Sequence, residues 1–248
     1  MSAGPAAAGP RRRTRRPPRF YFSLRSPYSW LAYRELLDRH RELAGRIEWV
    51  PFFEPDELSL KMLRAAGGEF PYTAMSAAKH RYILQDVRRL AAERGLEFGW
   101  PVDREPVWEV PHLGYLAAAR HGKGPEYIAL AARARWQDGL DVCDPGVVAG
   151  FGAELGIDPD ELSGAARDPE LREAGVRALL DVDRDGVFGV PFFTDHFDKY
   201  WGLDRLPAFV SALTRRFAAE PAPAPEPAQS PRAPHGPSFD DGHAGGCG

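Results

Sequence analysis

The stretch Arg19–Tyr33, with the sequence RFYFSLRSPYSWLAY, decides how the rest of the chain is organised. Its first residues alternate, with Phe20 and Phe22 on one face, and such alternation predicts a β-strand. Ser26 and Pro27 then favour the start of a helix, because Ser caps a first turn and Pro at the first helical position loses no hydrogen bond. The stretch therefore predicts a strand, a tight turn and a helix, with the Ser26 hydroxyl at the helix N-terminus.

The Ser26 hydroxyl has two interpretations. The simpler one is a helix cap, and the local sequence alone favours it. The alternative is a thiol-binding site, because the unpaired N–H groups and positive partial charge of a helix N-terminus stabilise anions, including the thiolates of Cys-X-X-Cys proteins. Here the four corresponding residues are Ser26-Pro27-Tyr28-Ser29. They contain no sulfur, so any thiol at this position must come from outside the protein.

Composition and charge narrow the possible functions. The chain has 248 residues, 44% of them hydrophobic, which is enough for one globular domain with a large insertion. A formal net charge of -3 gives no support for nucleic-acid binding, and no apolar run has the length of a membrane span.

Two cysteines, Cys143 and Cys247, form no disulfide framework, which favours a reducing cytoplasm. His243 and Cys247 are too few ligands to predict a metal site.

The order of the predicted elements indicates the fold. A strand–helix–strand unit over 19–53, with its helix over about Tyr28–Leu43, is followed by a short helix, and residues 72–183 have mostly helical spacing of apolar residues. A strand over 187–193 interrupted by Pro191, a turn at 194–198, a return strand and a closing helix over 206–217 complete the pattern. One mixed sheet with helices on both faces satisfies this order. The predicted fold class is α/β: a thioredoxin-like four-stranded mixed sheet with an inserted all-helical domain.

The domain boundaries follow from the same pattern. The Arg-rich N-terminus lacks the apolar core of a secretory signal, and the C-terminus lacks any periodicity. We therefore expect a disordered basic arm (1–18), a thioredoxin-like domain in two parts (19–68 and 184–217), an inserted helical domain (69–183) and a disordered tail rich in Pro, Ala and Gly (218–248).

Two later segments are expected at the same end of the sheet as Ser26. A Pro that interrupts a strand is unfavourable unless it lies at an edge or bulge or takes the cis form. Pro191 is therefore either an edge residue without a role or follows a cis bond that frees the Val190 backbone to pair with an extended ligand. In the segment 202–205, Asp204 is either a helix cap or a partner for an ammonium group. These features suit a small peptide-like thiol with a carboxylate and an α-amino group, such as glutathione.

Four motifs, in this order, resemble those of a known family. They are Phe20-Tyr21-Phe22 with Ser26-Pro27-Tyr28-Ser29-Trp30-Leu31, then Trp136-Gln137-Asp138-Gly139-Leu140-Asp141, Phe188-Gly189-Val190-Pro191 and Trp201-Gly202-Leu203-Asp204-Arg205-Leu206. The set is similar to the DsbA-like 2-hydroxychromene-2-carboxylate isomerases and to their relatives, the kappa-class glutathione transferases. The resemblance spans roughly residues 20–217, and it implies a thioredoxin fold with an inserted helical domain and a homodimer.

The resemblance also implies an activity, namely a thiol-dependent isomerase for an aromatic or unsaturated small molecule. Ser26 would be the catalytic residue that hydrogen-bonds and activates the glutathione sulfur. Val190, before a cis Pro191, would pair with the cysteinyl backbone, while Asp204 and the Leu203 backbone would bind the γ-glutamyl end. The implied cofactor-binding residues are Tyr28, Val190, Pro191, Leu203, Asp204 and Arg205.

The chain departs from the family at two points. Position 203 is usually polar and is Leu here, so only its backbone can serve. The family often uses an Asn after the second strand, whereas this chain has none, and Glu54, Lys61 and Glu69 are alternatives for it. The excess of Arg over Lys indicates a GC-rich genome, which leaves mycothiol as an alternative to glutathione if the source is an actinobacterium.

Other interpretations stay open. A transferase would conjugate the same thiol to an electrophile and consume it, whereas an isomerase returns it. A non-catalytic thioredoxin-fold partner in a biosynthetic pathway is a further alternative. His112 is an acid–base helper or, more usually for such a residue, a hydrogen-bonded structural group. Four aromatic residues of the helical region either line a pocket or, as is more common, belong to the core: Trp100, Trp108, Tyr115 and Trp136.

Overall fold

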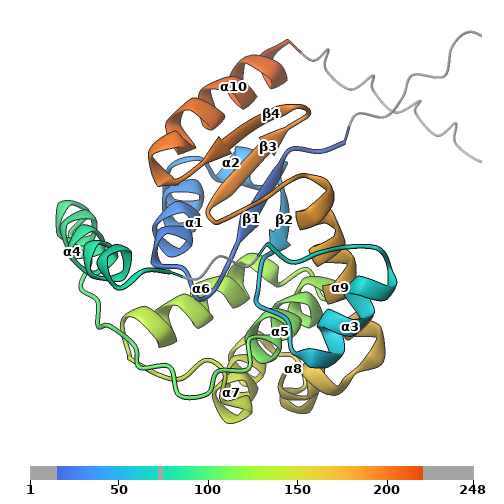
Figure 1. Cartoon of the computed structure of the whole chain (residues 1–248). Coiled ribbons are helices and arrows are strands. Elements are labelled where there is room, and N and C mark those ends of the chain that lie inside the picture. Colours follow the sequence, from blue (N-terminus) through green and yellow to red (C-terminus); the bar gives the residue numbers. More distant parts are fainter. Residues whose placement is uncertain (1–15, 72–74, 220–248) are drawn as a thin grey trace, which may run out of the picture.

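A four-stranded mixed sheet forms the centre of the protein (Figure 1). The structure is a computed structural model and describes residues 16–71 and 75–219. The strands are β1 (Arg19–Phe22), β2 (Glu48–Pro51), β3 (Phe192–Asp195) and β4 (Asp198–Trp201), in the order β2-β1-β3-β4. Because β1 is parallel to β2 and antiparallel to β3, the predicted mixed sheet is confirmed. The predicted arm and tail lie almost wholly outside the described residues.

Helices surround this sheet and continue below it in Figure 1. Their bounds are α1 (Pro27–Arg39), α2 (Arg41–Ala44), α3 (Glu57–Ala65), α4 (Ala77–Glu93), α5 (Glu109–Arg120), α6 (Gly124–Trp136), α7 (Pro145–Leu155), α8 (Pro159–Gly164), α9 (Pro169–Arg184) and α10 (Leu206–Ala218), with 3-10 turns η1 (Ala165–Arg167) and η2 (Leu203–Arg205). Within the two described ranges, none of these helices has both the length and the apolar character needed to cross a bilayer.

Alternation along β1 sends its side chains to two different cores. Phe20 and Phe22 are buried in the larger core, which α1 and α10 cover on one face of the sheet. Tyr21 is buried on the other face in a smaller cluster with Val182 of α9. Helix α9 belongs to the region predicted as the insertion, and here it packs against β2 and α3. The two-residue period of the strand therefore decides which helices lie on each face.

Two predicted elements begin or end elsewhere than expected. The segment 187–191, predicted as part of a strand, is not a strand, and β3 begins only at Phe192. The Val190–Pro191 bond is cis, and Pro191 has no N–H to donate to a strand partner. The first helix was predicted to reach Leu43, but α1 ends at Arg39 because His40 has φ -136° and ψ 37°, outside the helical region.

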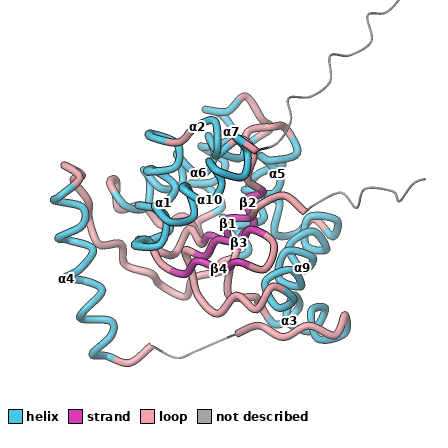
Figure 2. Tube along the Cα trace, turned by 90° about the horizontal axis from the view of Figure 1, so that it is seen from above, coloured by secondary structure: helices cyan, strands magenta, loops and turns pink. Residues whose placement is uncertain are grey.

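The inserted helices differ in how firmly they are packed. Helix α5 lies at the centre of its group and packs against α6, α7, α8 and α9. Helix α4 stands apart from the rest of the molecule in both Figure 1 and Figure 2, and only Val87 and Ala91 are buried along it. It is joined to α1 by a hydrogen bond from the Tyr28 hydroxyl to Asp86 and an ion pair between Arg94 and Glu35.

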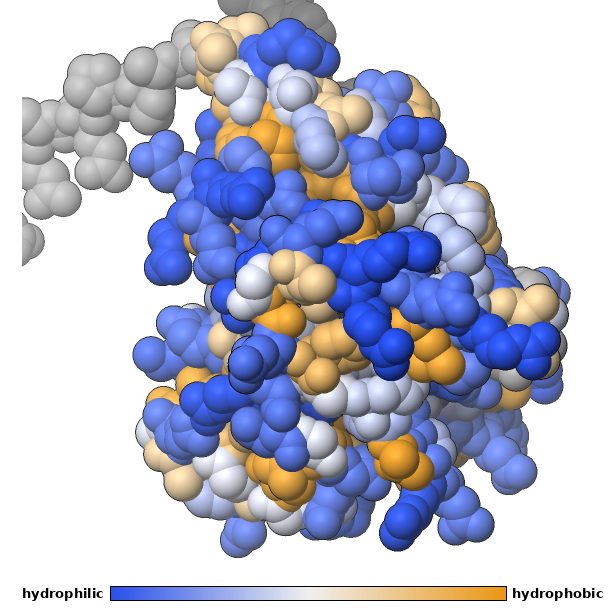
Figure 3. Space-filling model, turned by 90° about the vertical axis from the view of Figure 1, so that its left-hand side faces the viewer, coloured by the Kyte–Doolittle hydropathy of each residue, from blue (hydrophilic) through white to orange (hydrophobic). Residues whose placement is uncertain are grey.

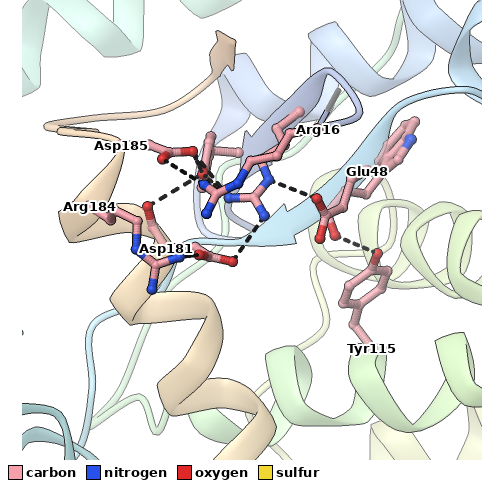
Figure 4. A network of polar contacts seen from close by, with 9 residues as sticks. Arg16, Glu48, Tyr115, Asp181, Arg184 and Asp185 are labelled. Carbon is pink, nitrogen blue, oxygen red and sulfur yellow. Dashed lines mark hydrogen bonds and ion pairs between the residues drawn. The ribbon is translucent and has the colours of Figure 1, made fainter. Parts of the chain in front are cut away.

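A buried network of charges joins the start of β1 to α9 and β2. The Arg19 guanidinium lies 2.7 Å from Glu48, 3.1 Å from Asp181 and 3.1 Å from Asp185, three carboxylates that Figure 4 labels. It also donates to the Tyr21 hydroxyl at 3.1 Å, and that hydroxyl donates to Asp185 at 2.5 Å. Because Arg19 and Tyr21 are both buried, these pairs satisfy groups that would otherwise be unsolvated.

Candidate active site

Three segments meet at one end of the sheet. In the antiparallel pairing of β1 with β3, Tyr21 lies opposite Phe192, so the chain leaves β1 toward Ser26 at the end where Pro191 enters β3. The Gly202 N–H donates to the Pro191 carbonyl at 2.9 Å, which brings the start of η2 to the same end, and η2 in turn contacts α1. The structure therefore brings the predicted segments together in the way the sequence indicated.

Ser26 caps helix α1, as the simpler interpretation expected. Its backbone is extended, with φ -90° and ψ 119°, and its hydroxyl oxygen accepts the Ser29 N–H at 3.2 Å. Its carbonyl accepts the Trp30 N–H at 3.1 Å, so the cap is complete. Because the oxygen accepts from the backbone, the hydroxyl proton stays available to a ligand. Ser26 is half-buried, and capping and thiol binding are therefore compatible at this residue.

Each backbone N–H in the turn from β1 to α1 has an acceptor. Two of these acceptors are serine hydroxyls and one is an imidazole, so side chains rather than secondary structure hold most of the turn. The four bonds run from the Ser23 N–H to Ser29 Oγ (3.3 Å), the Leu24 N–H to His112 Nε2 (3.0 Å), the Arg25 N–H to Ser23 Oγ (3.3 Å) and the Ser26 N–H to the Ser23 carbonyl (3.0 Å).

Ser23, Ser29 and His112 are the residues that sequence reasoning missed in this role. The signal for the two serines was present, because Ser23, Ser26 and Ser29 recur every three residues across the strand–helix junction. Hydroxyls at that spacing can bind each other's backbone N–H groups around a tight turn. The part played by His112 had no local signal, since 88 residues separate it from Leu24.

The Tyr28 hydroxyl is engaged within the protein, so a ligand would have to use the backbone of this residue. Its hydroxyl donates to Asp86 at 2.8 Å, and burial together with this bond raises the pKa of the phenol above its ordinary value. Its N–H, in the first turn of α1, has no acceptor among the residues that the structure describes. A free N–H in this position is a site for an anion or a carbonyl oxygen.

Val190 also has an unpaired backbone. Neither its N–H nor its carbonyl finds a hydrogen-bond partner within 16–71 and 75–219, and the residue is half-buried beside Pro191. An extended ligand can therefore pair with it as a short strand would. This geometry agrees with the expected use of Val190.

The remaining predicted binding residues lie on η2. The Leu203 side chain is buried in the core, so only its backbone faces the site. Asp204 is exposed and does not cap η2; its carboxylate lies 3.4 Å from the guanidinium of Arg205, which is also exposed. Gly202 precedes them with φ +103°, and a Cβ there would lie 2.6 Å from Asp204 Oδ1, so the bend requires glycine.

Of the three residues considered in place of the missing Asn, one contacts the turn. Glu54, which follows β2, accepts from the Arg25 guanidinium at 3.0 Å, and both side chains are about half exposed. Arg25 also lies 5.6 Å from the centre of the Trp108 ring. Lys61 and Glu69 are exposed residues on and after α3. Glu54 is therefore the acidic residue that the structure holds beside the Ser26 turn.

His112 lies beneath this turn and is fully buried. Burial lowers the pKa of the imidazole to about 3, and the nearby Arg135 guanidinium acts in the same direction. Arg135 is itself buried and binds Asp103 with two hydrogen bonds of 2.7 and 3.0 Å. A neutral, buried imidazole cannot exchange protons with a ligand near neutral pH, so this geometry favours the structural interpretation of His112.

Most of the aromatic residues considered for a pocket belong to the core. Trp108, Tyr115 and Trp136 are buried, whereas Trp100 is partly exposed. Trp100 lines a cavity of about 470 Å³ with Leu84 and other residues of α4 and the segment after it. Figure 3 faces the α4 side of the molecule and shows its apolar residues as separate patches divided by hydrophilic ones.

Comparisons with known proteins agree with this fold. The chain is 27% identical to 2-hydroxychromene-2-carboxylate isomerase of Sphingobium xenophagum over 195 residues, which cover 78% of this chain and 96% of that protein. A solved structure of a 2-hydroxychromene-2-carboxylate isomerase matches with a TM-score of 0.63 at 21% identity, over 81% of this chain and 95% of that one.

A second solved structure is that of the cytosolic disulfide reductase DsbM of Pseudomonas aeruginosa with glutathione. It matches with a TM-score of 0.53 at 19% identity, over 80% of this chain and 98% of that one. The family model described as a DSBA-like thioredoxin domain matches residues 19–214. The chain therefore belongs to the family of DSBA-like thioredoxin domains.

Proposed function

We propose that this protein is a thiol-dependent isomerase that acts on an aromatic or unsaturated small molecule, with glutathione or mycothiol as its cofactor. The relatives that it matches are isomerases and oxidoreductases, which supports an enzyme. Among them the isomerase fits better, because the helix start where thiol–disulfide oxidoreductases have cysteines holds Ser26 and Ser29 instead.

The observation that supports the proposal most directly is the state of the Ser26 hydroxyl. Its oxygen accepts the Ser29 N–H, so its proton is directed to whatever binds at the helix N-terminus. Accepting that bond polarises the hydroxyl and makes it a better donor. A thiolate is the ligand that gains most from such a donor beside the positive end of a helix.

The other groups at this end of the sheet fit the rest of a peptide-like thiol. Among the described residues, nothing pairs with the Tyr28 N–H, which suits a carbonyl or carboxylate oxygen, or with the Val190 backbone, which suits an extended cysteinyl unit. The exposed Asp204 carboxylate suits an α-ammonium group, with Arg205 beside it. We propose these residues, Pro191 and the Leu203 backbone as the cofactor site.

When bound, the thiol supplies a nucleophilic sulfur that adds to an unsaturated carbon of the substrate and later leaves it, so the cofactor is regenerated. Ser26 donates a hydrogen bond to that sulfur and thereby lowers its pKa from about 8.5. The turn fixes the direction of the hydroxyl, because its own N–H groups are paired. His112 takes no proton from the substrate, since both ring nitrogens are hydrogen-bonded inside the protein.

We also propose that the protein works in the cytoplasm as a homodimer, without nucleic acid or membrane as partner. Low-molecular-weight thiols are kept reduced in the cytoplasm, which suits a cofactor that must stay a free thiol.

Isothermal titration of the full chain with glutathione and with mycothiol tests the cofactor site. We expect binding of one thiol by the wild type and loss of that binding in Ser26→Ala. Ser211→Ala is the matched control, because this exposed serine of α10 donates to the Pro207 carbonyl of its own helix. Absence of heat with both thiols, or unchanged binding in Ser26→Ala, contradicts the proposal.

Counting free thiol during turnover separates the isomerase from the transferase. With an unsaturated aromatic test substrate, an isomerase leaves the thiol concentration constant while the product forms. A transferase consumes one thiol for each product molecule, because the sulfur stays on the product. Stoichiometric loss of thiol would therefore replace the proposed reaction with conjugation.

A further inference from the structure

One buried imidazole connects the inserted helices to the turn that holds Ser26. His112 Nδ1 lies 2.7 Å from the Trp108 carbonyl of its own helix, and Nε2 lies 3.0 Å from the Leu24 N of the turn. A carbonyl can only accept, so Nδ1 must bear the proton. A backbone N–H can only donate, so Nε2 must be unprotonated. Both neighbours therefore require the same neutral tautomer.

The surroundings of the ring hold it in this orientation. His112 has no exposed surface, and its ring stacks on Phe53 with centroids 5.1 Å apart and an angle of 20°. The edge of Trp108 closes another side at 6.1 Å. The Ser23 hydroxyl, 3.4 Å from Nε2, is a second donor to the same nitrogen. The ring is therefore fixed by packing on its face and by hydrogen bonds on its edge.

We propose that His112 is a positioning residue: as a neutral imidazole protonated on Nδ1, it accepts the Leu24 N–H and so fixes the turn that directs the Ser26 hydroxyl. The functional consequence rests on the proposed role of Ser26. The positioning itself does not, because it follows from contacts within the chain.

The hydrogen bond from the Leu24 N–H to His112 should affect the position of Ser26 as well as the stability of the protein. Leu24 is 6% exposed, so its N–H cannot turn to water without moving the backbone. Only one residue separates it from Ser26, whose own N–H bonds back to the Ser23 carbonyl at 3.0 Å. Removal of the imidazole acceptor leaves a buried N–H unpaired, and the turn must shift to solvate it. Because Ser26 belongs to the same turn, we expect this shift to change the position of its side chain.

A thiol introduced at the helix start reports on this position without any cofactor. The reference for this experiment, called the parent, is the full chain with Ser26→Cys, which introduces the thiol, and Cys247→Ser, which removes the thiol of the C-terminal segment. The third thiol, Cys143, stays unreactive, because burial raises the pKa of this half-buried residue to about 12. The pKa of the introduced thiol is measured by the pH dependence of its alkylation. It is compared in the parent, in His112→Gln, whose amide oxygen can accept the Leu24 N–H, and in His112→Phe, which fills the space without an acceptor.

We expect the introduced thiol to have a pKa below about 8.5 in the parent. In His112→Gln its pKa should stay close to that of the parent, and in His112→Phe it should be higher than in the parent by about 1. At pH 6 that rise corresponds to about a tenfold slower alkylation in His112→Phe. Equal pKa values in His112→Gln and His112→Phe, whether shifted or unshifted, overturn the proposal. Because no cofactor is added, this result is independent of whether the wild type binds glutathione or mycothiol.

A measurement on the unmodified protein covers the case in which His112→Phe does not fold. Nitrogen NMR of the ¹⁵N-labelled full chain distinguishes protonated from unprotonated ring nitrogens. We expect Nδ1 to be protonated and Nε2 to be unprotonated at pH 7, with a scalar coupling across the hydrogen bond between Nε2 and the Leu24 amide. A protonated Nε2, or a Leu24 amide that exchanges with water as fast as an exposed loop amide, overturns the proposal.

Discussion

Buried polar groups at the two ends of β1 have different kinds of partner. At the N-terminal end, the Arg19 guanidinium is surrounded by three carboxylates and the Tyr21 hydroxyl. At the other end, the turn is held by serine hydroxyls and one neutral imidazole, and the Tyr28 N–H and the Val190 backbone find no partner within the described part of the chain.

This difference separates stability from binding along a single strand. A buried cation whose partners come from the protein leaves no group for a ligand, and its removal leaves three partly buried or exposed carboxylates close together without it. Unpaired backbone groups beside a helix N-terminus are poor for stability but suited to a ligand. Substitutions at the first end should therefore change the free energy of unfolding, and substitutions at the second should change binding and turnover.

The largest effect is expected from Arg19→Met. It leaves Glu48, Asp181 and Asp185 without their shared cation, and the free energy of unfolding should fall by about 3–5 kcal/mol. Denaturant titration measures this loss. Arg184→Met is the control, because the exposed Arg184 guanidinium pairs with Asp181 at 2.8 Å and its loss should change stability by less than about 1 kcal/mol. Similar losses in the two variants contradict the contrast between the ends.

The next prediction compares alanine substitutions of two serines, Ser26 and Ser29, that lie three residues apart. Ser26→Ala should lower kcat/KM by about 10²–10³-fold, as expected when a donor to a developing anion is lost, and stability by only about 1 kcal/mol. Ser29→Ala should lower stability more, by about 1–3 kcal/mol, because its buried hydroxyl accepts the Ser23 N–H, and should lower kcat/KM less, because Ser29 acts on the cofactor site only through the turn. Kinetics and denaturation on both variants test this, and equal kinetic losses would remove the distinction.

A smaller effect concerns acid stability. The pKa of His112 is about 3 in the folded protein and 6.5 in a model peptide, so below pH 6.5 the unfolded chain binds a proton that the folded chain does not. Stability due to this group is therefore present above pH 6.5 and lost as the pH falls, by about 2 kcal/mol between pH 6.5 and pH 5. The charged group that faces the ring is the Arg135 guanidinium, which acts with burial to keep the imidazole neutral.

His112→Gln isolates that contribution. Asp56, whose pKa is lowered by hydrogen bonds and by Arg172, also contributes to acid unfolding, but it is present in both proteins and cancels in their difference. Denaturant titrations between pH 5 and pH 8 should show a steeper decline for the wild type than for His112→Gln. Parallel curves would show that His112 is protonated in the folded state as easily as in a peptide.

The smallest effect is expected at Asp204, an exposed residue of η2. Asp204→Asn should leave the free energy of unfolding within about 0.5 kcal/mol, because its pair with Arg205 is solvated. It should nevertheless raise the Kd for glutathione by about 3–10-fold, since the ammonium group of the ligand loses a charged partner. Arg177→Met, at another exposed pair, is the control for a general charge effect. An unchanged Kd removes Asp204 from the proposed cofactor site.

The sequence was most informative where the decisive contacts are local. The strand, the Ser26 cap and the helix after Pro27 lie within fifteen residues, and their signals depend on nearest neighbours along the chain. The cis bond at Pro191 was one of two alternatives that the interrupted strand left open, and only the family resemblance favoured it. These local signals, taken in order, were enough to predict a mixed sheet with inserted helices.

The rest depended on partners far apart in the sequence. Arg19 and Asp185 are 166 positions apart, and nothing in either neighbourhood indicates that the other will be its partner. The acceptor for Leu24 comes from a helix 88 positions away, so His112 could not be distinguished from any other buried histidine. The end of α1 at His40 depends on a change of backbone direction that the apolar spacing does not reveal.

The outer strands of the sheet also limit how this protein can associate with itself. β2 and β4 each have four residues, and among the described strands each has a partner on one side only. Pro51 ends β2 without an N–H to offer, and β4 begins with the exposed charges of Asp198 and Lys199. Short, charged or proline-terminated edges discourage strand addition between molecules. A homodimer of this protein would therefore have to form through side-chain packing of its helices or loops, and not by joining two sheets into one.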